Sequence, residues 1–597
     1  MGNSDKRQKS RWRKKRVRRF PNNTQTNKEN VAPQPQPPAA SASAATPSGS
    51  NSKESEKMNP SSTEDFNFLM NTASLSEVFD FAQTDCKGCG YASYRTVKVD
   101  ASRKIGLCQH IIVSCMCGER QTFFSSKRID PSNDKSRFDI NIRTVITFRE
   151  LGLGYTPLLN FSRHMNMPAP LKQFSYERIM NMIHPYYAQA AEESMNKAAS
   201  NVTKSSPDDK PTDIVASFDG SWQRRGFASL NGIVSCIERE NNKIVDVAVK
   251  TKKCKSCVFW EKKKDSPKYH DWKETHVCNV NHQGSASAME TVGTLEIFKR
   301  SIEKRNLRYT TFIGDGDSSA HPSVVEADPY DGESINKGEC IGHVQKRVGK
   351  NLRDMRKKLP SDRKKAIFGT GGRNKLTDSA INYIQNCYGL AIRQNTNNLY
   401  QMKKNVSAIM SHCSDIPDAS VRHKWCPRTE DSWCSYWNTT TKSKDHKCKL
   451  NLPPSIRNEP EIVKLFDRLR DDELLRKCLH GKTQNVNESF NGIVWTRCPK
   501  RVFVTKTTLE IGVNSAIIEF NEGKRGIERV MQLIGLPIGK HQSTQNEKSR
   551  KRKLKFRNLK SSSPVKRRRK SLRAERKNWN DKTKEKEGTL YEYGLGL

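Results

Sequence analysis

Long apolar runs are missing from this sequence of 597 residues. No uninterrupted apolar stretch approaches the roughly twenty residues needed to cross a bilayer, and the first thirty residues hold no apolar segment of the secretory kind. Mean hydropathy is low, at −0.82, although 34% of the residues are hydrophobic. These absences favour a soluble intracellular protein with no membrane partner, in which several folded domains are joined by polar segments.

Acidic residues are also scarce. The chain has 64 Asp and Glu against 106 Lys and Arg, which gives a net charge of +42. More than half of this excess lies in two short segments, residues 1–20 and 548–577. Dense basic arms bind phosphate backbone by releasing counterions, and residues 566–570 also have the composition of a nuclear import signal. We therefore expect a nucleic-acid partner and a location in the nucleus, although a basic segment can equally be a solubilising tail.

An intracellular chain is not expected to form disulfides, so its seventeen Cys should be free thiols or metal ligands. A pair-plus-pair pattern of the zinc-ribbon type is formed by Cys86, Cys89, Cys115 and Cys117. Four unrelated buried cysteines are the alternative, and Cys108 or His110 could replace one ligand. Bound zinc would stabilise a segment too short to build a large core.

A second pattern of metal-ligand spacing lies farther along the chain. Its residues are Cys254, Cys257, Cys278 and His282, with His276 as the alternative fourth ligand. Lysines and aromatic residues stand between the two pairs, including Trp260, Tyr269 and Trp272, and they suit a zinc knuckle that faces DNA. A loop without metal is the competing interpretation, but four ligands at this spacing favour zinc.

Strand and helix patterns alternate in the middle of the chain. Apolar runs predict strands at 214–218, 230–237, 244–249 and 309–313. Residues 240–242 predict a hairpin turn, and an amphipathic pattern predicts a helix at 287–304. Three strands, a helix and a further strand are how an RNase H-like domain begins, so we expect an α/β fold. Residues 344–475 predict mainly helix.

Two carboxylates follow predicted strands directly. Asp219 and Asp315 each stand where an apolar run stops at an acid, with glycine beside it. Such acids can hold paired divalent ions, and a neighbouring glycine leaves room for a phosphate or a metal. A strand followed by Asp-Gly can also be a simple turn. Asp317 would face the same side of an extended strand as Asp315, but Asp315 is favoured because it continues the apolar run.

Four stretches, in sequence order, resemble signature blocks of the Mutator-like transposase domain. They are Asp219-Gly220-Ser221-Trp222, Gly314-Asp315-Gly316-Asp317-Ser318, Cys340-Ile341-Gly342-His343-Val344-Gln345-Lys346-Arg347 and His480-Gly481-Lys482-Thr483-Gln484-Asn485-Val486-Asn487-Glu488-Ser489. The resemblance runs from about residue 70 to 535. It implies a DDE triad of Asp219, Asp315 and Glu488 that binds two Mg²⁺ or Mn²⁺ ions on an RNase H-like core, with a helical insertion between the second and third acids. From the residues alone, Glu488 could equally lie in a polar helix start.

Within the third stretch, Cys340 and His343 resemble the CxxH element of Mutator-like enzymes. As a metal site this pair is incomplete, and the residues that could complete it are His412, Cys413, His423, Cys426 and Cys434. An isolated Cys or His is more often packed in a core. The basic stretch 345–353 predicts a helix whose charged face is either solvated or a phosphate clamp beside the active site.

The activity that the resemblance implies is attack of water on a phosphodiester at the ends of a mobile element, followed by attack of the freed 3′-hydroxyl on target DNA. The expected partners are double-stranded DNA, at terminal inverted repeats and target sites, and further copies of the chain in a homodimer or higher oligomer. A domesticated, non-catalytic, zinc-dependent DNA-binding regulator and a structure-selective nuclease are the alternatives. The presence of all three acids argues against catalytic decay.

Composition shifts divide the chain into seven predicted parts. They are a disordered basic arm and linker (1–62), a zinc-ribbon-like module (63–135), a helical DNA-binding or linker region (136–205), the first part of the RNase H-like core with a zinc knuckle at 254–282 (206–343), a helical insertion (344–475), the end of the core with Glu488 (476–536) and a disordered basic tail (537–597). Within the third part we expect a helix at 176–204 that Pro185 kinks or splits.

Overall fold

The computed structural model describes most of the chain after residue 64. The described residues are 65–90, 95–203, 210–224, 229–315, 319–429, 432–437 and 448–562, with short pieces at 564–569, 571–573, 575–576 and residue 579. The predicted basic arm and linker, residues 1–62, and the alternative acid Asp317 lie outside them. None of the described helices combines the length and the apolar character needed to cross a bilayer.

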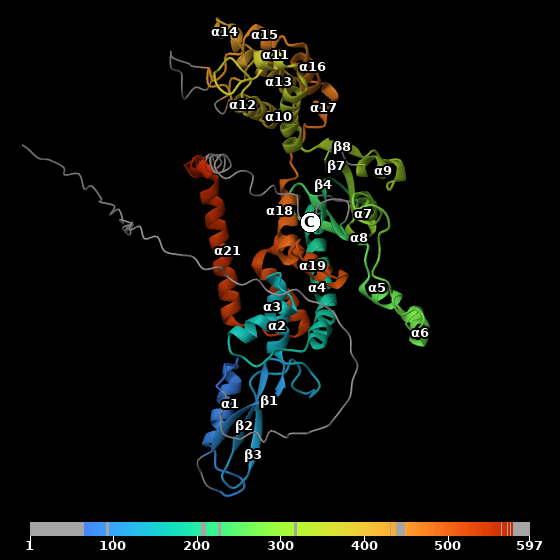
Figure 1. Ribbon diagram of the computed structural model, residues 1–597, viewed down its shortest axis with the longest axis vertical. Coiled ribbons are helices and arrows are strands. Elements are labelled where there is room, and N and C mark those ends of the chain that lie inside the picture. The colour runs from blue at the N-terminus through green and yellow to red at the C-terminus, as the bar shows by residue number, and fades with distance from the viewer. Residues whose placement is uncertain are drawn as a thin grey trace, which may run out of the picture. The chain divides into compact units, whose positions relative to one another are not determined.

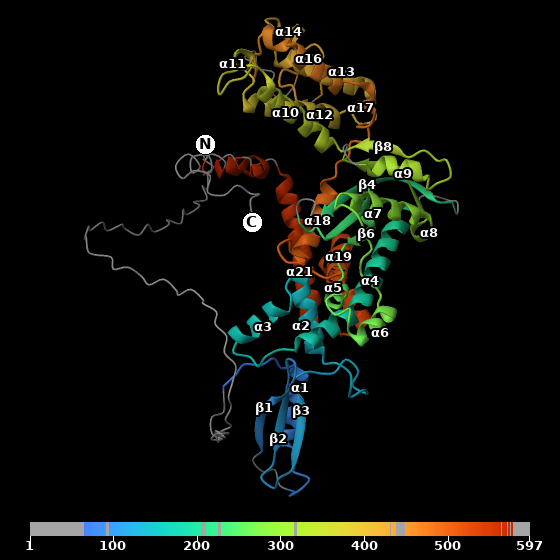
Figure 2. The same ribbon diagram turned by 45° about the vertical axis from the view of Figure 1, so that its right-hand side comes forward.

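The first folded segment is a small antiparallel sheet with one helix. Its elements are α1 (Thr72–Gln83), β1 (Thr96–Ile105), β2 (Cys108–Ser114) and β3 (Arg120–Phe124), with strand order β1-β2-β3. The helix lies along the sheet in both ribbon views (Figure 1, Figure 2). Val78 of α1 packs against Ile111 and Val113 of β2, which forms a core of only a few side chains. So small a core supports little stability by itself.

Three helices follow the small sheet. They are α2 (Asp139–Glu150), α3 (Tyr155–His164) and α4 (Gln173–Thr203). The expected helix at 176–204 is therefore present, but it runs through Pro185 as one element and is not split there. Ile183 and Tyr187, on either side of the proline, are fully buried. We attribute the continuity to this burial, since tertiary packing can outweigh the loss of one helical hydrogen bond.

A mixed five-stranded sheet carries the predicted strand pattern. Its strands are β4 (Thr212–Trp222), β5 (Asn231–Glu238), β6 (Ile244–Thr251), β7 (Leu307–Gly314) and β8 (Asn336–Glu339), in the order β6-β5-β4-β7-β8. Strand β5 is antiparallel to β4 and β6, whereas β7 is parallel to β4 and β8. The four predicted strands and the hairpin turn are confirmed. Strand β8 was not predicted, because its four residues contain no apolar run.

Several helices lie in sequence between the later strands of this sheet. They are α5 (Lys255–Glu261), α6 (Pro267–Thr275), α7 (Ala288–Lys299), α8 (Ser301–Arg305) and α9 (Ala320–Ala327). Of these, α7 packs on β4, β5 and β6, whereas α5 and α6 bury none of their side chains. The predicted helix at 287–304 corresponds to α7 and α8. Phe218 of β4 stacks on Phe312 of β7, with 4.8 Å between ring centroids, and on Phe298 of α7. These aromatic contacts fix the ends of β4 and β7, where the two predicted acids stand.

The segment after β8, residues 341–476, is mainly helical, as predicted. The helices are α10 (Ile341–Lys358), α11 (Ser361–Ile367), α12 (Asp378–Arg393), α13 (Leu399–Cys413), α14 (Ala419–Arg422), α15 (Pro454–Arg457), α16 (Pro460–Leu469) and α17 (Asp472–Arg476). They share a hydrophobic core of their own, which includes Val348, Ile384 and Val406. We call this segment the helical insertion.

The chain then returns to the sheet, and the described elements that follow are all helical. These are α18 (Asn485–Arg497), α19 (Lys506–Glu522), the 3₁₀ turn η2 (Gly523–Gly526), α20 (Ile527–Ile534) and α21 (Lys540–Ser561). Buried Arg497 pairs with Glu150 of α2 at 3.0 Å and with Glu519 of α19 at 2.5 Å. Removing this guanidinium would leave Glu150 with the hydroxyl groups of Tyr187 and Ser515. It would leave Glu519 with Lys524, so the cost should be smaller than the about 3–5 kcal/mol of an uncompensated buried charge. The pairs nevertheless secure α18.

Helix α21 corrects the expectation that order fades after Pro537. Residues 540–561 contain neither proline nor glycine and are rich in Lys, Arg and Gln, which are good helix formers. The helix also has tertiary contacts at its start. Gln542 bonds to the Met531 sulfur at 2.9 Å, and Asn546 bonds to Glu528 at 2.9 Å. High charge was therefore a poor guide to disorder here.

Candidate active site

The sheet register brings the first two predicted acids to the same edge. Strands β4 and β7 are parallel neighbours, and Ser217 pairs with Ile313. Asp219 and Asp315 each lie two residues further on, so they occupy corresponding positions at the carboxyl ends of adjacent strands. Such an edge is where open α/β sheets bind their ligands. The sequence signal of an apolar run ending in an acid thus predicted two residues that share this edge, and their role as metal ligands stays a prediction.

Helix α18 brings Glu488 to the same edge, because polar side chains of the helix bond to β4. Gln484 donates to the carbonyl of Phe218 at 2.7 Å, and Asn487 donates to that of Ser217 at 3.0 Å. Asn491 donates directly to Oδ2 of Asp219 at 2.7 Å. Figure 1 shows α18 beside β4, although some 270 residues separate them in sequence. Glu488 lies on the first turn of this helix, between the residues that make these bonds.

Electrostatics indicate that the acids lie close to one another. The pKa of Asp219 is raised from its ordinary value of 3.8 to about 7, chiefly by burial. The negative charges of Glu290, Glu488 and Asp315 contribute to the rise in that order, while His343 opposes it. The carboxylates are not among the sets of ligands whose atoms all lie within 4.8 Å of one another in the described residues.

Glu290 is a fourth acid that sequence reasoning missed. It lies on the first turn of α7, and it is the neighbouring charge with the largest effect on the pKa of Asp219. Gly220 leaves space for it, because a Cβ on this glycine would come within 2.9 Å of the Glu290 carboxyl group. The glycine beside Asp219 thus admits a protein carboxylate. No local sequence pattern marks Glu290. Its position could be predicted only by knowing that α7 packs over Gly220.

The Asp315 side of the site holds two basic groups from α10. His343 Nδ1 lies 3.7 Å and Arg347 3.6 Å from Asp315 Oδ1, and Arg347 also lies 3.2 Å from Glu339. A hydrogen bond with Cys340 raises the pKa of His343. The Cys340 sulfur accepts a hydrogen bond from the backbone of Gln484 at 3.3 Å. The CxxH pair therefore connects the start of α18 to Asp315.

Cys340 and His343 do not meet the residues that were considered as completing ligands. Neither belongs to any of the Cys/His groups found in the described part of the chain, and His412, His423, Cys426 and Cys434 form a separate group. The idea of one shared metal site is therefore wrong. The reason is topological, since α10 starts at the sheet edge whereas α13 and the residues after it belong to the core of the helical insertion.

The first predicted zinc cluster comes together beside the small sheet. The donor atoms of Cys86, Cys89, Cys115 and Cys117 all lie within 4.8 Å of one another, which a tetrahedral zinc ion requires. Cys86 and Cys117 are 3.4 Å apart, and Cys89 and Cys115 are 3.8 Å apart. The alternatives Cys108 and His110 are not part of the group. Both lie on β2, whose register pairs them with β1.

The second cluster has a different fourth member from the favoured one. Cys254, Cys257 and Cys278 gather with His276, whose Nε2 lies 3.2 Å from Cys257 and 3.5 Å from Cys254. His282 instead contacts the carbonyl of Ser285 at 2.9 Å. The structure thus supports the alternative, because the chain turns back towards β6 after Cys278. Its aromatic residues partly pack within the knuckle, where Trp272 stacks on His276 and on Trp260.

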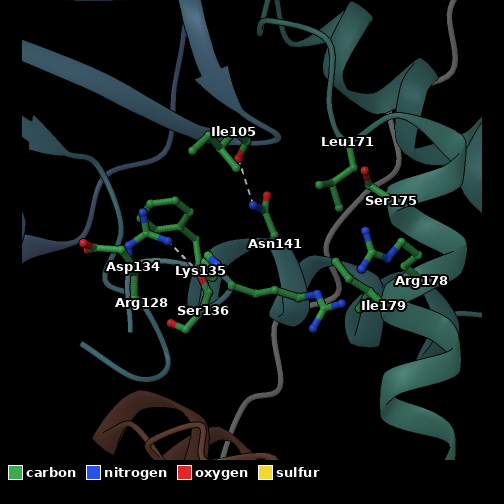
Figure 3. Close-up of a pocket in the computed structure, with 12 residues that line it drawn as sticks. Ile105, Arg128, Asp134, Lys135, Ser136, Asn141, Leu171, Ser175, Arg178 and Ile179 are labelled. Carbon is green, nitrogen blue, oxygen red and sulfur yellow. Dashed lines mark hydrogen bonds between the residues drawn. The ribbon is translucent and has the colours of Figure 1, made fainter. Parts of the chain in front are cut away.

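A separate basic cleft lies between the small sheet and the helices that follow it. Its cationic lining residues are Arg128, Lys135, Arg137 and Arg178, against a single acid, Asp134. Figure 3 shows Arg128, Lys135 and Arg178 around the opening, with Arg128 bonded to the carbonyl of Ser136 and Asn141 to that of Ile105. The cleft volume is about 460 Å³. A concave surface with this charge suits a polyanion.

Three features of the chain are typical of proteins that act on nucleic acid. They are the acids at the sheet edge, the Cys/His clusters and the basic cleft. The family model for Mutator-like transposase matches residues 67–434, which is more than half of the chain. The chain therefore belongs to the Mutator-like transposase family. Membership implies a DNA partner and an enzyme of the kind that cuts or joins nucleic acid. No curated protein matches the sequence significantly. The family match includes Asp219 and Asp315 but ends before Glu488.

Proposed function

We propose that the chain is a DDE transposase, which cleaves DNA at terminal inverted repeats and joins the freed ends to target DNA. The proposal takes the five-stranded sheet, with β5 antiparallel and β7 and β8 parallel to β4, as an RNase H-like core. It takes α10 to α17 as an insertion between the second and third acids. The proposal keeps the domain division predicted from the sequence, with α21 added at the start of the C-terminal segment.

One observation carries the proposal. Asp219, Asp315 and Glu488 are far apart in the chain, yet the charges of the other two both raise the pKa of Asp219. Folding has placed negative charges together in a partly buried position, which is unfavourable unless positive charge is added. His343 and Arg347 lie closest to Asp315, and the charge of His343 opposes the rise in the pKa of Asp219 without cancelling it.

The donor set fits magnesium or manganese ions. Carboxylate oxygens are the hard ligands that these cations prefer, and the pKa of Asp219 is raised first by burial and then by the negative charges of neighbouring acids. When bound, two such ions supply positive charge to the attacking and leaving oxygens of a phosphodiester. Asp219, Asp315 and Glu488 would hold them.

The protein's own residues then have distinct roles. Asn491 fixes the orientation of the Asp219 carboxylate through its 2.7 Å bond. Arg347, close to Asp315, can donate to a phosphate oxygen and position the scissile group. Water attacks phosphorus as the 3′-oxygen leaves, and the resulting 3′-hydroxyl later attacks a target phosphodiester. No covalent protein intermediate is needed.

DNA recognition would involve surfaces away from the acids. The basic cleft and the two cysteine clusters described above are suited to gripping backbone and repeats. A synaptic complex of two or more copies would bring two element ends together, by analogy with other DDE enzymes. The basic residues 566–570 would direct the protein to the nucleus, where its DNA lies.

A strand-cleavage assay tests the proposal. Labelled DNA bearing the element's terminal repeat is incubated with the full chain and Mg²⁺ or Mn²⁺, beside Asp219→Asn and Glu488→Gln. Both variants should still bind the DNA but lose cleavage by at least a hundredfold. Glu522→Gln, an equivalent change at an exposed position, should cleave normally. Repeat binding by wild type with no cleavage under any divalent metal would instead favour a non-catalytic DNA-binding protein.

A further inference from the structure

The helical insertion contains a buried group of two histidines and two cysteines outside the sites described so far. His412 ends α13, His423 follows α14, and Cys426 and Cys434 lie in the irregular segment that comes next. We infer that these four residues form a structural zinc site. The site belongs to the insertion alone, and it goes beyond the proposed catalytic function.

The separations within the group match a tetrahedral metal site. The Nδ1 atoms of His412 and His423 are 3.1 Å apart, Cys434 Sγ lies 3.4 Å from His423 Nδ1, and Cys426 Sγ lies 3.6 and 3.8 Å from the two Nδ1 atoms. Zinc bonds of about 2.0–2.3 Å in a tetrahedron place neighbouring ligand atoms roughly 3.3–3.8 Å apart. Both imidazoles thus present the same kind of nitrogen towards one common point.

The outer nitrogen of each histidine has its own contact. Tyr383 Oη lies 2.8 Å from Nε2 of His412, and Cys448 Sγ lies 3.6 Å from Nε2 of His423. Zinc-binding histidines commonly use their second nitrogen in this way, which fixes the ring and its tautomer. The indole of Trp437 also donates to the His423 carbonyl at 2.8 Å. Orientation of both rings is therefore secured from outside the group.

Burial separates this group from an exposed or catalytic metal site. All four residues are buried, with no side chain more than 4% exposed. Four protein ligands complete a tetrahedral shell and leave no position for substrate, which is the pattern of a structural zinc site.

Other buried cysteines of the insertion provide a contrast. Cys387 and Cys413 lie in its hydrophobic core among aliphatic side chains, and neither joins a metal-ligand group. Cys426 and Cys434 belong instead to a much smaller cluster, packed by Trp433, Tyr436 and Trp437. That cluster holds the segment after α14 against α13 with few aliphatic residues. Zinc would supply the stability that so small a core lacks.

Metal analysis of the full chain, purified in reducing buffer and dialysed against a small excess of zinc, tests the inference. Wild type should hold three zinc ions per chain if both other clusters are filled. Cys426→Ser/Cys434→Ser should hold one fewer. The matched double variant Cys236→Ser/Cys498→Ser, which alters two buried cysteines outside the insertion, should keep the wild-type number. An unchanged zinc content in the first double variant would overturn the inference.

Two further measurements separate a metal site from a general loss of folding. Cys434→His replaces one zinc ligand by another, so it should retain the wild-type zinc content, whereas Cys434→Ser should not. Retention of the full zinc content by Cys434→Ser as well would count against a metal role for this position. Mass spectrometry of unreduced wild-type protein gives the second result. Free thiols at Cys426 and Cys434 agree with zinc binding, and a disulfide between them would contradict it.

Discussion

Asn491 donates a 2.7 Å hydrogen bond to Oδ2 of Asp219. The bond joins two segments that are 272 residues apart in sequence, and it comes from the helix that carries Glu488. The bond fixes the direction of the Asp219 carboxylate. It also ties Asp219 to the helix that carries Glu488. Because the bond engages Oδ2, the other carboxylate oxygen of Asp219 can bind a cation.

Replacing Asn491 should therefore weaken catalysis without abolishing DNA binding. We expect Asn491→Ala to reduce cleavage about tenfold to a hundredfold, which is the usual cost of losing a group that orients a metal ligand. The measurement is the rate of strand cleavage at saturating Mn²⁺, with DNA affinity determined in parallel. Asn485→Ala, on the same helix, is the control and should cleave at the wild-type rate. Full activity in Asn491→Ala would show that the bond has no role in catalysis.

Glu290 should influence how tightly the site binds cations. Its negative charge raises the pKa of Asp219 more than any other neighbouring residue does, and it adds a carboxylate to the proposed ion-binding edge. We expect Glu290→Gln to raise the Mn²⁺ concentration for half-maximal cleavage several-fold. Glu303→Gln, an exposed position on α8, is the matched control. An unchanged metal requirement in Glu290→Gln would assign this residue to packing alone.

The effect of metal on stability should depend on pH. Asp219 has a pKa of about 7 in the fold against an ordinary 3.8, so the folded chain keeps a proton that the unfolded chain loses between these values. Stability is therefore lost as pH rises towards 7. Cations bind the charged carboxylate, so Mn²⁺ should raise the Tm more at pH 8 than at pH 6. Asp219→Asn should remove this difference, and an equal Tm rise at both pH values in wild type would contradict it.

The basic cleft should contribute to DNA affinity through charge. Arg137→Ala/Arg178→Ala removes two of its cations, and each phosphate that is no longer neutralised lowers the slope of log affinity against log salt by about 0.9. Binding to repeat DNA, measured across a salt series, should weaken with a slope shallower by about one to two. Lys464→Ala/Arg468→Ala removes the same charge from the exposed face of α16. An equal weakening in both double variants would point to a non-specific charge effect.

Sequence patterns predicted the parts of the site that lie on single elements. Apolar strands ending in an acid identified Asp219 and Asp315, and the resemblance to Mutator-like transposases supplied Glu488. Cysteine spacing identified both clusters, since two ligands close together in sequence can face one ion by local geometry. The strand ends and the cysteine pairs, which sequence patterns predicted, therefore depend on short-range chain geometry.

Residues that act through tertiary packing escaped prediction. Glu290 approaches Asp219 only because α7 packs over Gly220, and no local signal marks it. His276 takes the position expected of His282 because the chain turns back to β6 after Cys278. The sequence offered His412, His423, Cys426 and Cys434 as possible ligands, but with Cys340 and His343 as the other members of the site. The structure groups the four without that pair. Spacing along the chain cannot show which of two distant clusters a histidine joins.

The central claim is that Asp219 holds a catalytic cation, and a change of metal preference tests it most directly. In Asp219→Cys a sulfur replaces the carboxylate oxygens, and sulfur binds Mn²⁺ far better than the harder Mg²⁺. The cleavage rate of this variant is measured with each ion beside wild type and Asp219→Ala. Inactivity with Mg²⁺ and partial recovery with Mn²⁺, in the cysteine variant alone, is the predicted result. Equal activity of Asp219→Cys with both ions, or wild-type cleavage by Asp219→Ala, would contradict the account.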